Sequence, residues 1–209
     1  MLAAIVLAGG ESRRFGADKL SADLDGRTLL ERVVSALPVE AAVYVVGPPR
    51  PLDRPVTWLR EEPAGGGPAA AMVCGLKTAL DGSATLFAVL PGDAPDAARA
   101  ADRLVRRLVA DPDVGAVVAA DPDGRLQPLQ LALRRPAALE LVAAAGPNAG
   151  ANASARALIQ ALDPPAATSR PILPRSPGQI GHTVVEVLPE ADLWDIDTPE
   201  QLSAWLDRD

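Results

Sequence analysis

The chain has 209 residues, 48% of them hydrophobic and 22% charged, a composition typical of globular proteins. Its formal net charge of −7 repels nucleic acid, so we expect no nucleic-acid partner. Cys74 is the only cysteine, which excludes an internal disulfide, and no apolar run has the length of a membrane span. We therefore expect a cytoplasmic protein with one domain over residues 1–209 and no membrane partner.

Short apolar runs alternate with longer amphipathic ones along the chain. Strands are predicted over Leu2–Leu7, Ala42–Val46, Val56–Leu59, Thr85–Leu90, Gly115–Ala119, Leu129–Leu133 and Thr183–Leu188. Helices are predicted over Thr28–Leu37, Ala69–Leu80, Asp96–Ala110, Ala137–Ala144, Ser154–Leu162 and Pro199–Leu206. Thr198, Pro199 and Gln201 form a capping-box pattern at the start of the last helix. The alternation predicts an α/β fold with a mostly parallel sheet and helices on both faces.

Three segments interrupt this alternation. Residues 48–55 are proline-rich and should form a surface loop, and residues 146–153 form a small polar link. Residues 164–181 hold five prolines and should be irregular. His182, the only histidine, belongs to this irregular stretch and is expected to be an exposed polar residue rather than a metal ligand.

The first predicted strand ends in Gly9-Gly10, and the cations Arg13, Arg14 and Lys19 follow. A buried strand that breaks into a glycine loop can bring backbone N–H groups against phosphate, and basic side chains can neutralise its charge. The spacing matches neither a Walker loop nor the dinucleotide glycine pattern. The loop therefore indicates a phosphate site, with a solvated basic turn as the alternative.

Other polar loops follow the predicted strands, and in open α/β sheets ligands bind at the carboxyl ends of strands. Gly65-Gly66-Gly67 would let a base or ribose approach the backbone closely, unless it is only a flexible turn. Glu61 or Glu62 could accept hydrogen bonds from a guanine edge, with surface solvation as the alternative.

Two acidic turns provide candidate metal ligands at the same edge. Asp93 follows a buried strand, where a carboxylate suits Mg²⁺ together with phosphate oxygens and water, although it could instead form a turn or cap a helix. Asp195 and Asp197 alternate along an extended segment, so only one should face the site. Asp197 is the first choice for the metal, with Asp195 as its substitute.

Several motifs, in order, resemble the MobA-like nucleotidyltransferases, the molybdenum cofactor guanylyltransferases. They are Leu7-Ala8-Gly9-Gly10-Glu11-Ser12-Arg13-Arg14-Phe15-Gly16-Ala17-Asp18-Lys19, Gly67-Pro68-Ala69-Ala70-Ala71 with Gly75-Leu76, Pro91-Gly92-Asp93-Ala94-Pro95, Gln127-Pro128-Leu129 and Asp195-Ile196-Asp197-Thr198-Pro199-Glu200. The resemblance spans nearly the whole chain. It implies a three-layer, Rossmann-like nucleotidyltransferase fold with a mostly parallel mixed sheet of about seven strands. It also implies an enzyme that transfers GMP from GTP to molybdopterin or its molybdenum form and releases pyrophosphate.

The resemblance also implies roles for individual residues. Arg14, Lys19 and Asp93 would be catalytic, and Asp93 and Asp197 would hold Mg²⁺. The nucleotide would be bound by Leu7, Ala8, Gly9, Gly10, Lys19, Gly66, Gly67 and Pro68. The implied partners are the nucleoside triphosphate, a phosphorylated acceptor such as molybdopterin, and proteins that deliver the molybdenum cofactor.

The closing motif departs from the family pattern. Asp195 and Asp197 stand where asparagines are usual, a version shared with the related cytidylyltransferases, whereas Leu7-Ala8-Gly9-Gly10 follows the guanylyltransferase form. CTP as donor, a sugar phosphate or another phosphorylated acceptor, and a non-catalytic nucleotide-binding protein therefore remain alternatives.

Overall fold

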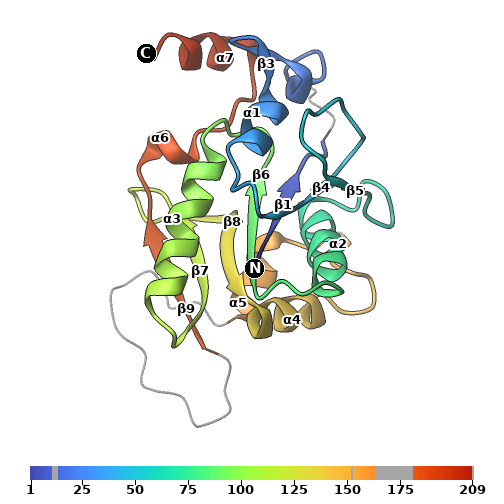
Figure 1. Ribbon diagram of the computed structural model, residues 1–209, viewed down its shortest axis with the longest axis vertical. Coiled ribbons are helices and arrows are strands. Elements are labelled where there is room, and N and C mark those ends of the chain that lie inside the picture. Colours follow the sequence, from blue (N-terminus) through green and yellow to red (C-terminus); the bar gives the residue numbers. More distant parts are fainter. Residues whose placement is uncertain (11–13, 152, 163–180, 209) are drawn as a thin grey trace.

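A seven-stranded mixed sheet forms the centre of the computed structural model, which describes residues 1–10, 14–151, 153–162 and 181–208. Its strand order is β5-β4-β1-β6-β8-β7-β9 (Figure 1). The strands are β1 (Leu2–Leu7), β4 (Ala42–Val46), β5 (Thr57–Leu59), β6 (Leu86–Pro91), β7 (Val114–Ala120), β8 (Leu126–Arg134) and β9 (His182–Val187).

Strand direction decides which loops meet at one edge of the sheet. β5, β4, β1 and β6 run parallel, and β9 runs parallel to β7. β8 pairs antiparallel with both β6 and β7. The carboxyl ends of all the other strands and the start of β8 therefore lie along the same edge, and the prediction of a mostly parallel mixed sheet is confirmed.

Helices cover both faces of the sheet, as predicted (Figure 1). The helices are α1 (Leu29–Ser35), α2 (Pro68–Leu80), α3 (Ala97–Ala110), α4 (Arg135–Ala144), α5 (Ala155–Ala161), α6 (Glu190–Leu193) and α7 (Pro199–Leu206). Alternate residues of β1 explain the two cores, because Ala3 and Ile5 pack with α2, α4 and α5, whereas Ala4 and Val6 pack with α1 and α3. None of the helices in the described ranges is long and apolar enough to cross a membrane.

Four short elements within the described ranges lie outside the predicted set. The 3₁₀ turn η1 (Lys19–Ser21) is followed by a two-stranded ribbon of β2 (Asp23–Leu24) and β3 (Arg27–Thr28). Asp25 and Gly26 both have positive φ in the turn of this ribbon, the conformation that Asp-Gly favours in tight hairpins. The fourth element is α6, a single helical turn.

His182 corrects one prediction, because it is the half-buried first residue of β9 and not an exposed residue of an irregular stretch. Its backbone N–H donates to the carbonyl of Asp113, which ties the start of β9 to the start of β7. The loop at residues 48–55 has no regular element, as predicted. Residues 163–180 lie outside the described residues, so the prediction for 164–181 is not tested there.

Candidate active site

A cavity of about 550 Å³ lies at the carboxyl ends of β1, β4, β5 and β6. It is lined by Leu7, Gly9, Gly10, Gly47, Pro48, Arg60, Glu61, Ala64, Gly65, Gly67, Pro68, Ala71, Pro91, Asp93 and Leu129. Both glycine loops and the Asp93 turn thus meet at one cavity, as their positions after parallel strands predicted. Of the residues predicted to bind the nucleotide, Ala8, Lys19 and Gly66 do not belong to this lining.

The first glycine loop is held at its base and open at its turn. The Ala8 N–H donates to the Val46 carbonyl at 2.8 Å, and the Leu7 carbonyl accepts from the Gly92 N–H at 2.9 Å. Gly10 has φ +115°, a region that favours glycine, and a Cβ on it would meet nothing within 4 Å. This backbone is accessible to a ligand in the cavity. Residues 11–13, including Arg13, lie outside the described residues.

The second glycine loop leads into the N-terminus of α2. Gly67 caps the helix with φ +90°, and Pro68 occupies its first turn. The Gly65 N–H donates to Glu61 Oε1 at 2.9 Å, and the Gly66 N–H donates to the Pro63 carbonyl at 3.0 Å. Gly66 therefore shapes the loop from within, while its two glycine neighbours line the cavity.

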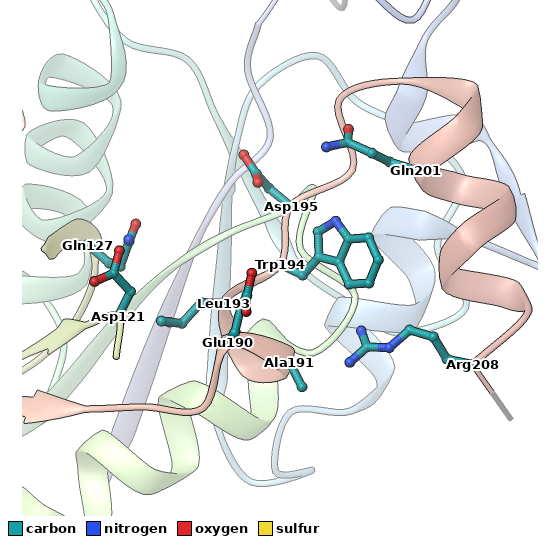
Figure 2. Close-up of a pocket in the computed structure, with 9 residues that line it drawn as sticks. All are labelled: Asp121, Gln127, Glu190, Ala191, Leu193, Trp194, Asp195, Gln201 and Arg208. Atoms are coloured by element: carbon teal, nitrogen blue, oxygen red, sulfur yellow. The ribbon is translucent and has the colours of Figure 1, made fainter. Parts of the chain in front are cut away.

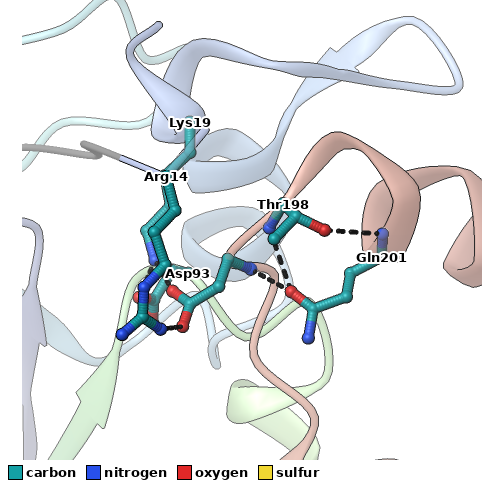
Figure 3. A network of polar contacts seen from close by, with 6 residues as sticks. Arg14, Lys19, Asp93, Thr198 and Gln201 are labelled. Carbon is teal, nitrogen blue, oxygen red and sulfur yellow. Dashed lines mark hydrogen bonds and ion pairs between the residues drawn. The ribbon is translucent and has the colours of Figure 1, made fainter. Parts of the chain in front are cut away.

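Lys19 joins the two predicted metal ligands. Its Nζ lies 2.7 Å from Asp93 Oδ2 and 2.7 Å from Asp197 Oδ1 (Figure 3). The Lys19 side chain is only 12% exposed. Burial opposes its charge, but the carboxylates of Asp93 and Asp197 together raise its pKa above the ordinary lysine value. The lysine is thus held as a cation between two carboxylates.

Hydrogen bonds hold the backbones that carry the two carboxylates. The Ile196 N–H donates to the Asp93 carbonyl at 2.9 Å, which ties the C-terminal segment to the end of β6. Gln201 Oε1 accepts from the N–H groups of Asp197 and Thr198 at 2.7 and 2.9 Å, while the Gln201 N–H donates to Thr198 Oγ1 (Figure 3). The predicted capping box is therefore confirmed, and it positions Asp197.

Arg14 lies at the outer side of this cluster. Its Nη1 is 3.5 Å from Asp197 Oδ2, and the Arg14 side chain is 80% exposed. An exposed pair at this distance contributes little to stability, so the guanidinium can reorient toward an anionic ligand at small cost.

A second cavity, of about 470 Å³, lies beyond Asp195 on the side of β7, β8 and α6 (Figure 2). It is lined by Asp121, Gln127, Glu190, Ala191, Leu193, Trp194, Asp195, Gln201 and Arg208. Burial of the Asp195 carboxyl, together with the charges of Asp93 and Asp197, raises its pKa above the ordinary aspartate range. Asp195 lines this cavity whereas Asp197 contacts Lys19, so the two side chains lie on different sides of their segment, as their alternation predicted. Which of the two binds a metal stays a prediction.

Arg50 is a residue that sequence reasoning missed, although it holds the first loop. Its Nε and Nη2 donate to the two oxygens of Asp18 at 2.7 and 2.9 Å, and its Nη1 donates to the carbonyls of Ala8 and Pro48. Asp18 also accepts from the Leu20 N–H at the start of η1. This clamp fixes the backbone on both sides of Lys19, and the pattern Pro-Pro-Arg-Pro gave no signal of it.

The clamp predicts a specific acid sensitivity. The hydrogen bonds from Arg50 outweigh the effect of burial and lower the pKa of Asp18. A carboxyl with a lowered folded-state pKa contributes stability above its unfolded-state value of about 3.9 and loses it as pH falls below that value. We expect Asp18→Asn to lower the melting temperature at pH 7 and to flatten its decline below pH ~4. An unchanged pH profile of thermal unfolding would contradict the clamp, and Asp102→Asn, an exposed helical position, serves as control.

Comparison with known proteins places this arrangement in a family. The MobA-like NTP transferase domain matches residues 4–169. A protein of Mycobacterium bovis (strain BCG / Pasteur 1173P2) named "Probable molybdenum cofactor guanylyltransferase" is 43% identical over 99 residues, or 45% of this chain and 49% of that protein. The chain thus spans about half the length of the curated relatives it matches.

Two solved structures have the same fold at low identity. Molybdopterin-guanine dinucleotide biosynthesis protein A from Archaeoglobus fulgidus has a TM-score of 0.63 and 16% identity, over 99% of this chain and 97% of that chain. A Mycobacterium tuberculosis H37Rv protein in complex with manganese has a TM-score of 0.58 and 15% identity, over 100% and 99%. The extent of the family match and the agreement in fold lead to one conclusion: this chain belongs to the MobA-like NTP transferases, a family of nucleotidyltransferases.

Proposed function

We propose that this protein transfers GMP from GTP to a phosphorylated acceptor, molybdopterin or its molybdenum form, with release of pyrophosphate. The carrying observation is that Asp93, which shares the Lys19 ammonium with Asp197, lines one cavity, while Asp195, two positions before Asp197, lines the other. A transfer between two bound substrates requires a charged centre between their sites. The Mycobacterium bovis relative matches this chain over about half of its own length. Its name, a probable molybdenum cofactor guanylyltransferase, supports GTP as the donor and the molybdenum cofactor as the acceptor.

In the proposed reaction an acceptor phosphate oxygen attacks the α-phosphorus of GTP. A new oxygen–phosphorus bond forms, the bond from the α-phosphorus to the bridging oxygen breaks, and pyrophosphate leaves with that electron pair. Arg14 and Lys19 neutralise the triphosphate and the leaving pyrophosphate, and the open backbone at Gly9 and Gly10 donates to phosphate oxygens. Leu7, Ala8, Gly66, Gly67 and Pro68 shape the nucleotide site, and one domain, residues 1–209, carries both substrates.

The residues of the cluster fit a divalent cation. Asp93 and Asp197 each direct one carboxylate oxygen at the same position, which the ammonium group of Lys19 occupies. Within the described ranges no three or more His, Cys, Asp or Glu side chains form a metal site by themselves. Two carboxylates completed by phosphate oxygens and water are what Mg²⁺ prefers. When bound there, Mg²⁺ would neutralise charge at the α-phosphate, and the manganese complex of the Mycobacterium tuberculosis protein makes a divalent ion reasonable for this fold.

Thermal unfolding with each of the four nucleoside triphosphates, with and without Mg²⁺, tests the choice of donor. We expect GTP with Mg²⁺ to raise the melting temperature most, because a ligand that binds only the folded state stabilises it. A rise in the melting temperature with CTP alone would show that CTP is the donor. The closing motif, with Asp195 and Asp197, leaves this alternative open.

Pyrophosphate release tests the transfer itself. GTP, Mg²⁺ and molybdopterin are expected to yield pyrophosphate and a dinucleotide product, whereas omission of molybdopterin should leave only background. GTP binding without pyrophosphate release, with molybdopterin and with sugar phosphates as acceptors, would show a non-catalytic nucleotide-binding protein instead.

A further inference from the structure

We infer that Lys19 closes the divalent-cation site of the nucleotide-free protein and that metal binding at Asp93 and Asp197 requires its ammonium group to leave. This inference rests on the proposed function, because it concerns the same two carboxylates. It adds that the metal and the triphosphate bind together. When Lys19 leaves, the metal neutralises the two carboxylates and the triphosphate neutralises the displaced ammonium.

The first step is that one position cannot hold two cations. Lys19 Nζ lies 2.7 Å from one oxygen of Asp93 and 2.7 Å from one oxygen of Asp197. An oxygen-bound Mg²⁺ lies 2.0–2.1 Å from its ligands, so an ion that binds both oxygens takes the space that the ammonium fills. The ammonium and the metal therefore compete for this position.

The second step is that the backbones of Asp93 and Asp197 are held in place without the lysine. The Asp93 carbonyl accepts from the Ile196 N–H, and the Asp197 N–H donates to Gln201 Oε1. These bonds involve backbone atoms and the cap of α7, and none of them involves Lys19. Because the backbones keep the two carboxylates near each other, their repulsion makes the position between them favourable for positive charge.

The third step is that the ammonium can move while the backbone stays in place. Asp18, held by Arg50, precedes Lys19, and the Lys19 carbonyl accepts from the Ala22 N–H. A lysine carries its charge on a flexible four-carbon stem, so rotation about side-chain bonds suffices. Asp93 also lines the cavity of about 550 Å³ at the glycine loops, which gives the displaced ammonium a neighbouring space. A triphosphate in that cavity would attract it.

Charge then explains why metal and nucleotide depend on each other. With Lys19 in place the pair of carboxylates is half neutralised, and a metal ion gains little by replacing a tethered cation. Phosphate groups compensate Lys19 once it has left, and the metal compensates Asp93 and Asp197. Such coupling is reciprocal, so each ligand increases the affinity of the other by the same factor.

The test measures Mn²⁺ binding to the full chain in the absence of nucleotide, by titration calorimetry and by the electron paramagnetic resonance signal of free Mn²⁺. We expect Lys19→Met to bind Mn²⁺ at least about fivefold more tightly than the wild type, the lower end of usual coupling factors. Lys77→Met is the matched control, because Lys77 is exposed on α2 and should leave the affinity unchanged. Lys19→Gln provides a second neutral variant if the first fails to fold.

Tighter Mn²⁺ binding by a folded Lys19 variant, absent in Lys77→Met, supports the inference. Equal or weaker binding, or no binding by any variant, overturns it. The proposed function can fail separately. If Lys19→Met binds Mn²⁺ no more tightly than the wild type, while the wild type releases pyrophosphate from GTP, only the role of Lys19 is rejected. If Lys19→Met binds Mn²⁺ more tightly but the wild type transfers no nucleotide, only the proposed function is rejected.

Discussion

Asp93→Asn is expected to reduce pyrophosphate release from GTP and molybdopterin by about 10²–10³-fold, the usual loss when one preorganised electrostatic partner of a transition state is removed. Asparagine keeps the size of the side chain but removes the negative charge that faces Lys19 at 2.7 Å. The rest of the cluster stays in place, because the Asp93 backbone carbonyl still accepts from Ile196. The loss should therefore appear in turnover while the fold is kept.

Initial rates at saturating GTP and acceptor, over a range of Mg²⁺ concentrations, provide the measurement. Asp102→Asn removes a carboxylate of the same type from an exposed pair on α3 and should retain the wild-type rate. If Asp93→Asn releases pyrophosphate at the wild-type rate, the metal-dependent mechanism is wrong. Circular dichroism and thermal unfolding of both variants separate this outcome from misfolding.

Gly47→Ala is expected to destabilise the protein by about 1–3 kcal/mol, the range for overpacking a tightly packed position. A Cβ at Gly47 would lie 2.3 Å from the carbonyl oxygen of Ala8 and 2.5 Å from its carbon. These are backbone atoms at the end of β1, so no side-chain rotation relieves the contact. Gly47 also has φ +156° and donates its N–H to the Leu59 carbonyl. The substitution therefore forces β1, β4 and β5 apart at the cavity.

Thermal unfolding checks this prediction, with a loss of roughly 2–4 °C expected per kcal/mol in a chain of this size. Gly82→Ala is the matched control, because the nearest atom to its added Cβ is 3.4 Å away and its backbone has no positive φ. Weaker GTP binding should accompany the loss of stability at Gly47, since this residue lines the cavity. A melting temperature equal to that of the control would show that β1, β4 and β5 separate at little cost.

Local patterns predicted most of the elements. β1 and β4 have the predicted boundaries, because an apolar run between polar residues defines a buried strand by itself. α7 begins at Pro199 after the Thr198 cap, since a capping box needs only neighbours in sequence. The ribbon β2–β3 could have been found from Asp25-Gly26, but its strands are two residues each, too short for periodicity to indicate.

The candidate site was only partly predictable. Gly9, Gly10 and Asp93 could be placed at one edge because they follow strands of the expected parallel sheet. The partnership of Arg50 with Asp18 could not, because it joins two loops 32 residues apart. Nor could the sequence pair Lys19 with Asp197, which lie 178 residues apart and meet only where the C-terminal segment crosses the end of β6.

The sequence by itself determined the alternation of strands and helices, the glycine loops after the strands, and the family to which the motifs belong. These depend on periodicity, turn chemistry and residue order, all of which act over a few positions along the chain. Only the tertiary structure decided that β8 runs antiparallel and that one lysine lies between Asp93 and Asp197. Pairing across the sheet and contact between remote side chains depend on how whole elements pack, and no local pattern carries that information.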